Sequence, residues 1–299
     1  MEPRKGDGAA RAIALFLLGG VFFVTLNAIA KALTPSIGPV MVIWGRFFFH
    51  VLLAALLFPA AVPRLFSTHQ LGCQLGRSVL LMLSTVCNFL ALAYLPLGDV
   101  SAIVFTAPLM VAGLAVFWLG ERVSPARWVA IVAGLAGAVM VIRPGLGTVS
   151  PGALLAVGCA LAYALYQVST RIVREGDPIV SLLFAGLGGL LLFSLLAPFA
   201  WTPPTAWEWA QLAIMGFAGA IGHLMVILAL QRLEASRLTP FTYIQLVWAM
   251  AASYLVFGDI PSAWTLLGGS VIVASGLYVW WLTVRERAAE AARIGSAVR

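Results

Sequence analysis

Apolar residues run along this chain in long blocks, and short polar or proline-rich stretches separate the blocks. A helix needs about 20 apolar residues to cross a bilayer, and ten blocks reach that length. Turn residues such as Gly38-Pro39 and Arg143-Pro144-Gly145 mark the breaks. The pattern predicts an all-α membrane protein with ten transmembrane helices, at residues 11–33, 38–59, 74–95, 99–119, 125–143, 150–173, 178–199, 207–231, 236–257 and 263–284.

The fourth and ninth of these helices, with their flanking turns, are copies of one unit. The segment Leu97–Trp128 has an echo in Leu233–Trp264, which begins 136 positions later. Each copy starts with a short turn that carries a carboxylate, continues through an apolar span, and closes on a Gly-acid pair followed by a Pro and a Trp. The repeat predicts two halves of five helices each, residues 1–145 and 146–299, joined in one membrane domain.

Basic residues fix the predicted orientation. With both termini in the cytoplasm, the inner segments hold 15 of the 18 Lys and Arg residues, and the outer segments hold only Lys31 and Arg143. This arrangement predicts a multi-pass protein of the inner membrane and accounts for the net charge of +7 without a nucleic-acid partner. Because each half has an odd number of helices, the two halves are predicted to be inverted relative to each other, with the substrate near the midplane.

The remaining composition narrows the chemistry. Hydrophobic residues make up 62% of the 299 residues and charged residues 10%, whereas a soluble domain has about 25% charged residues. The three cysteines have no metal-ligand or disulfide spacing, and no nucleotide-binding or hydrolase motif is present. We therefore expect no metal, no cofactor, no catalytic residue and no enzymatic activity.

Polar residues inside the spans are candidates for a transport pathway. Asn27 lies between Phe23 and Lys31 on one face of the first helix, and the same aromatic, amide, base pattern recurs 140 positions later with Gln167 at its centre. Amides can bind both ends of a zwitterion. The alternative is a helix–helix hydrogen bond.

The other candidates also have two interpretations. Arg46 is well inside a span and either binds a carboxylate or clamps the helices, and His50 and His223 either titrate or pack. The central aromatic residues either stack on an apolar side chain or fill space between helices. The predicted lining of a midplane cavity is Asn27, Trp44, Asn88, Tyr163, Gln167, His223, Tyr243 and Trp248, with Arg46, Pro108 and Pro240 in structural or gating roles.

Several motifs resemble the EamA-type branch of the drug/metabolite transporter superfamily. They are the arginine in Trp44-Gly45-Arg46-Phe47, Pro108 within the fourth helix, and the Leu119-Gly120-Glu121-Arg122 that closes that helix. The second half departs from the pattern, because it lacks an arginine near Ala185 and has Gly258-Asp259 in place of Gly-Glu. Within the family the chain is most similar to a bacterial exporter of aromatic amino acids. The resemblance implies amino-acid export, and it favours a structural role for the family-wide arginine.

These observations together predict an exporter of amino acids, aromatic or other apolar ones first, that works by alternating access. No Asp or Glu lies centrally in a span, so facilitated diffusion is expected. The expected partners are a small-molecule substrate and the lipid bilayer; the oligomeric state is open and a monomer is compatible with the sequence. One alternative is an exporter of drugs or other metabolites on the same fold, and another is a membrane-embedded enzyme acting on lipid.

Overall fold

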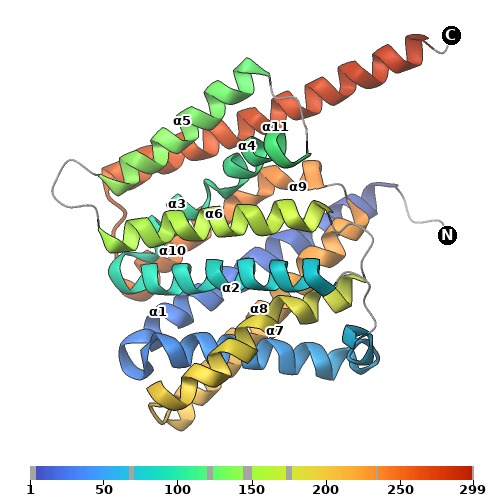
Figure 1. Ribbon diagram of the computed structural model, residues 1–299. Helices are drawn as coiled ribbons and strands as arrows, with labels where there is room; N and C mark the ends of the chain where they lie inside the picture. The colour runs from blue at the N-terminus through green and yellow to red at the C-terminus, as the bar shows by residue number, and fades with distance from the viewer. Residues whose placement is uncertain are drawn as a thin grey trace.

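A computed structural model describes residues 5–66, 71–119, 124–143, 150–172, 177–233 and 235–297, and within these ranges the regular structure is helical throughout. Figure 1 shows a bundle of helices, with both chain ends on the same side of it. The α-helices are α1 (Lys5–Leu57), α2 (Leu71–Tyr94), α3 (Leu97–Val104), α4 (Ala107–Leu119), α5 (Pro125–Ile142), α6 (Pro151–Ile172), α7 (Pro178–Leu196), α8 (Ala206–Arg232), α9 (Ala235–Thr242), α10 (Ile244–Phe257) and α11 (Ala263–Ala297). The short 3₁₀ turns in the described ranges are η1 (Pro59–Ala61), η2 (Pro63–Phe66) and η4 (Ala197–Ala200).

Helix α1 contains the first two predicted spans. Its backbone is not helical at Gly38, where φ is 77° and ψ is 157°, and prolines at positions 35 and 39 flank this point. A positive φ is open to glycine without steric cost, so Gly38 lets the chain reverse direction there. The two arms of α1 accordingly run through the bundle separately (Figure 1).

The fourth and ninth spans are each broken into two helices. The first break lies at Phe105 and Thr106, between α3 and α4, and the second lies at Tyr243, between α9 and α10. Pro108 lies just after the first break, in the first turn of α4, where a missing N–H leaves no bond unmade. Pro240 lies inside α9, one turn before the second break.

The helix pairs that pack most closely follow the repeat. Helix α2 packs on α6, and α1 packs on α8. The repeat relates α2 to α8 and the first arm of α1 to α6, so it converts one of these pairs into the other. Helix α5 packs on α11, and α1 packs on α7. In each of these pairs the two helices, or in α1 its second arm, are equivalents in the two repeats. Such pairings are those of two repeats related by an approximate two-fold axis, with the broken helices at equivalent positions.

The surface of the bundle suits lipid. Large apolar side chains are widely exposed, including Phe199, Leu255 and Ile260. Within the described residues, nine helical segments are long and apolar enough to cross a membrane, and the first of them includes both arms of α1. The protein is therefore an all-α membrane protein with two five-helix repeats, as the hydrophobic pattern predicts.

Candidate functional site

A cavity of about 370 Å³ lies between the two repeats. Its walls come from both halves of the chain, since α1 to α4 and α6, α8, α9 and α10 all contribute. The polar lining residues are Asn27, Arg46, Ser84, Thr85, Asn88, Ser101, Cys159, Tyr163, Gln167, His223, Thr242 and Gln245. The aromatic lining residues other than Tyr163 and His223 are Phe16, Phe23, Phe89 and Phe105. An apolar chamber with a few polar groups is the usual form of a small-molecule site.

Two of the predicted amides meet in this cavity. The side-chain N–H of Asn88 donates a hydrogen bond of 2.7 Å to the Oδ1 atom of Asn27. Gln167 lines the cavity from α6, on the same helix as Tyr163. The Asn27–Asn88 bond links α1 to α2, yet each amide has further donor and acceptor capacity. These groups are therefore available to a polar ligand.

Arg46 also lines the cavity, although only 4% of its surface is exposed. Its guanidinium carbon lies 4.5 Å from the centre of the Phe47 ring. Its Nε and Nη1 atoms are buried and have no hydrogen-bond partner. The cavity thus contains a cation whose donors are largely unused.

The two membrane-embedded histidines are neighbours. His223 lines the cavity, with its ring 4.9 Å from that of Phe23 and 5.8 Å from that of His50. His50 is fully buried, and its Nε2 atom lies 3.2 Å from the carbonyl oxygen of Leu182. Because a carbonyl only accepts, this nitrogen is the donor, and the ring of His50 is held behind the cavity wall.

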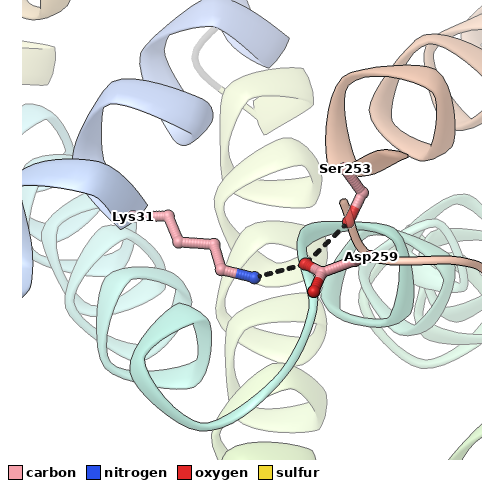
Figure 2. Close-up of polar contacts among 3 residues, drawn as sticks. All are labelled: Lys31, Ser253 and Asp259. Carbon is pink, nitrogen blue, oxygen red and sulfur yellow. Dashed lines mark hydrogen bonds and ion pairs between the residues drawn. The ribbon is translucent and has the colours of Figure 1, made fainter. Parts of the chain in front are cut away.

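An ion pair lies one helical turn beyond the cavity lining, at the end of the bundle opposite the chain termini. Lys31 is one turn beyond Asn27 on the same face of α1, and its Nζ lies 2.8 Å from Oδ2 of Asp259. Ser253 donates to the same carboxylate oxygen at 3.2 Å. Figure 2 shows Lys31 and Ser253 reaching Asp259 from separate helices. The pair joins the first repeat to the second.

A second contact joins the repeats at the same end. Thr265, in the first turn of α11, donates its hydroxyl hydrogen to Oδ1 of Asp99 in α3 at 2.7 Å. At the opposite end the lining continues to Phe16 in α1 and Leu238 in α9, near the ends of the helices that lie beside the termini.

Ion pairs at the end beside the termini lie away from the cavity lining. Arg64 donates to Asp177 at 3.0 Å, and Arg127 lies 3.4 Å from Glu286. Asp177 caps α7, and its carboxylate accepts from the Ile179 N–H at 2.9 Å. Burial acts to raise the pKa of this carboxyl, but the hydrogen bonds from Ile179 and Arg64 outweigh it and hold the pKa below its usual value.

Trp44, a predicted lining residue, does not belong to the cavity lining. Its indole N–H donates to Ser194 at 3.1 Å, and its ring stacks on Phe48 at 4.9 Å and meets Trp201 and Trp209. Positions 44 and 46 are about 200° apart around a helix. Since Arg46 faces the cavity, Trp44 faces the α7 and α8 side of α1 instead.

Two further aromatic residues lie outside the lining. Tyr243 is at the break between α9 and α10, where it is 4% exposed and packs with Ala138 and Ile272. Gly276 of α11 makes room for it, because a Cβ there would overlap the Tyr243 hydroxyl. Trp248 is half-buried, and α10 presents Gln245 and Ala249 to the cavity in its place.

Sequence reasoning missed several small polar residues of the wall. Ser84 and Thr85 on α2, Ser101 on α3 and Thr242 on α9 all line the cavity. Ser84 lies one turn before Asn88, so a search of that helix for polar residues at helical spacing would have found it. Some candidates lie outside the described side chains, namely Glu121, Arg122, Arg171 and Glu234.

A bundle of two equivalent repeats, with broken helices and a polar cavity between them, defines a membrane transporter. The sequence profile of the EamA-like transporter family matches residues 10–143 and again residues 150–281. The chain belongs to this family.

Relatives with named substrates match nearly the whole chain. An S-adenosylmethionine uptake transporter from Rickettsia conorii is 27% identical over 271 residues, which cover 89% of this chain and 91% of the relative. A riboflavin transporter from Rhizobium johnstonii is 30% identical, with 88% of each chain covered. A pseudopaline exporter from Pseudomonas aeruginosa is 26% identical, with 88% of this chain and 93% of the relative covered. The named cargoes are all small molecules, and they differ from one another.

A solved crystal structure has the same fold. It matches 94% of this chain and 98% of its own with a TM-score of 0.64, at 20% sequence identity. At that identity the likeness concerns the fold alone.

Proposed function

We propose that this protein exports amino acids, aromatic or other apolar ones first, across the inner membrane by alternating access. The observation that carries the proposal is the cavity of about 370 Å³ between the repeats, whose wall combines side-chain amides with aromatic rings. The amides of Asn27, Asn88 and Gln167 suit the charged ends of a zwitterion. The rings of Phe23, Phe105 and Tyr163 suit an apolar side chain.

The charge of the wall supports this cargo over a cationic drug on the same fold. The described lining residues include Arg46 and no Asp or Glu. A cation would enter a cavity whose fixed charge repels it, whereas the carboxylate of an amino acid would be attracted. The relatives include uptake transporters as well as an exporter, so the outward direction belongs to the proposal.

The proposed mode of transport is facilitated diffusion. A proton-coupled carrier commonly uses an Asp, Glu or His in the membrane. The described cavity wall offers only His223 for that role. We therefore expect the amino-acid gradient itself to drive transport.

The purified protein in liposomes tests this function directly. Liposomes loaded with unlabelled phenylalanine should take up labelled phenylalanine by counterflow, without a pH gradient or a membrane potential. Labelled tetraphenylphosphonium, an apolar cation, should not exchange. Protein-free liposomes give the background, and efflux of preloaded phenylalanine tests the outward direction.

Two results would contradict the proposal in different ways. Exchange of the cation without exchange of any amino acid would assign the cavity to drugs. Uphill accumulation that needs a pH gradient and disappears in His223→Ala would leave the cargo in place but replace facilitated diffusion with histidine-coupled antiport.

A further inference from the structure

Arg46 is buried, yet two of its three guanidinium nitrogens have no hydrogen-bond partner. It lies in the second arm of α1, is 4% exposed, and leaves Nε and Nη1 without a hydrogen bond. The nearest ring, that of Phe47, belongs to the next residue of the same helix. An arginine that clamped neighbouring helices would donate to their carbonyl oxygens, and one that snorkelled would reach the surface. The described contacts of Arg46 fit neither role.

The charges around Arg46 do not neutralise it. Among the described lining residues there is no acidic side chain, and the two nearby histidines are not acids. The described ion pairs all lie outside the lining: Lys31–Asp259, Arg64–Asp177 and Arg127–Glu286. A buried cation without an acidic partner is costly to the empty protein, and a bound anion would remove that cost.

A second buried arginine shows what a structural role looks like in this fold. Arg77 on α2 is 5% exposed, and its donors are bound by Gln74, Thr170 and Ser181. Arg77 does not belong to the cavity lining. The two arginines are buried to the same extent, but only Arg77 has hydrogen-bond acceptors for its Nε and Nη1 donors. Burial alone therefore does not explain the unbonded Nε and Nη1 of Arg46.

We infer that Arg46 binds the carboxylate of the transported molecule. The substrate class is then small organic carboxylates, of which amino acids are one member. This inference rests on the proposed transport function and deepens it. A guanidinium presents a planar fork of N–H donors that matches a carboxylate with two parallel bonds. The amide pair and Gln167 remain for the other polar groups of the cargo, and the rings remain for its apolar part.

Binding to matched ligand pairs tests the inference. The detergent-purified protein is titrated with phenylalanine against phenylalaninamide, benzoate against benzamide, and succinate against succinamide, with the melting temperature as readout. The wild type should prefer the carboxylate of at least one pair. Arg46→Gln should lose that preference through weaker carboxylate binding, by about tenfold or more. Arg46→Lys should retain part of it, because the charge remains while the fork is lost.

The melting temperature without ligand separates a binding role from a structural one. Arg46→Gln and Arg46→Met should melt at or above the wild-type temperature, since they remove an unpaired charge. Arg77→Gln is the matched control: it should lower the melting temperature but keep the preference for carboxylates, because its partners are protein side chains.

The outcomes separate this inference from the proposed function. A wild type without preference for any carboxylate, or an Arg46→Gln protein that keeps the preference, would overturn the inference. Loss of the fold in both the Gln and Met variants would assign Arg46 a structural role and overturn it as well. A preference for benzoate that depends on Arg46, together with no binding or counterflow of amino acids, would uphold the inference and refute amino-acid export.

Discussion

At the scale of single residues, hydrogen-bond capacity distinguishes the cavity wall from the rest of the bundle. Asn27 and Asn88 use one bond on each other, and a neutral hydrogen bond of this kind contributes only about 0.5–1.5 kcal/mol net. A ligand can therefore exchange with it at little cost. Gln167 faces the same cavity from the other repeat. The wall thus offers amides from both halves of the chain to one bound molecule.

A pair of substitutions tests this picture. Gln167→Leu should slow counterflow of every amino acid alike, by roughly two- to tenfold, because each cargo shares the zwitterion that loses one hydrogen bond. Trp248→Ala is the control and should leave the ratio of phenylalanine to alanine transport unchanged, since Trp248 lies outside the lining. The measurement is initial uptake at matched protein incorporation. A selective loss of phenylalanine transport in Trp248→Ala would return this residue to the cavity wall.

At the scale of elements, the cavity lining and the contacts around Asp259 lie on the same helix faces. Asn27 lines the cavity from α1, and Lys31 follows it by one turn. On α10 the lining residue Ala249 is followed one turn later by Ser253, which binds Asp259. Under the proposed alternating access, opening the end of the bundle opposite the termini would separate the two faces and break the contact of Lys31 with Asp259. The described helices α5, α7 and α11 contribute nothing to the lining.

Removing the ion pair should shift the protein towards opening at the end opposite the termini. The pair is partly exposed, with 18% and 31% of the two side chains accessible, and such pairs contribute up to about 1 kcal/mol, which is a factor of roughly five in population. In Lys31→Met or Asp259→Asn, a cysteine placed at Ser101 should react up to about fivefold faster with an impermeant maleimide added from that side. The native cysteines are replaced by alanine.

The control for this experiment is an ion pair at the other end of the bundle. Asp177→Asn removes a carboxylate that pairs with Arg64 at the start of α7, a helix outside the lining, and it should leave the labelling rate at Ser101 unchanged. Equal labelling rates at Ser101 in the wild type, Lys31→Met and Asp259→Asn would show that the Lys31–Asp259 pair does not hold the end opposite the termini closed.

At the scale of the whole molecule, the repeat is reflected in the packing of the helices. The pairs α2 with α6 and α1 with α8 exchange under the repeat, and the broken helices α3–α4 and α9–α10 occupy equivalent places. Under the proposed alternating access, a structure of this symmetry would have two related arrangements, one open to each side. In the described form, the contacts Lys31–Asp259 and Asp99–Thr265 join the repeats at the end opposite the termini.

Cysteine labelling tests the membrane orientation. Cysteines at Gly98 and Ser262, which lie at the end opposite the termini, should react from outside the cell, and cysteines at Ser124 and Ala235 should react only from inside. The reason is that the segments at the end beside the termini, where Ser124 and Ala235 lie, hold most of the basic residues. Reversed labelling at either pair would contradict the predicted cytoplasmic termini.

The hydrophobic pattern by itself determined the architecture of this protein, because the bilayer imposes a length and a polarity on each span that can be read locally. It predicted the ten spans, their division into repeats, and the amides of Asn27, Asn88 and Gln167 as candidates for the wall. Only the tertiary structure decided which face of each helix meets the cavity. It turned Trp44 and Tyr243 away, brought Thr242 and Ser84 into the wall, and left Nε and Nη1 of Arg46 without a hydrogen bond in the cavity wall. Those outcomes depend on how the helices are rotated and broken against one another, and periodicity in a chain that is apolar on nearly every face does not specify that rotation.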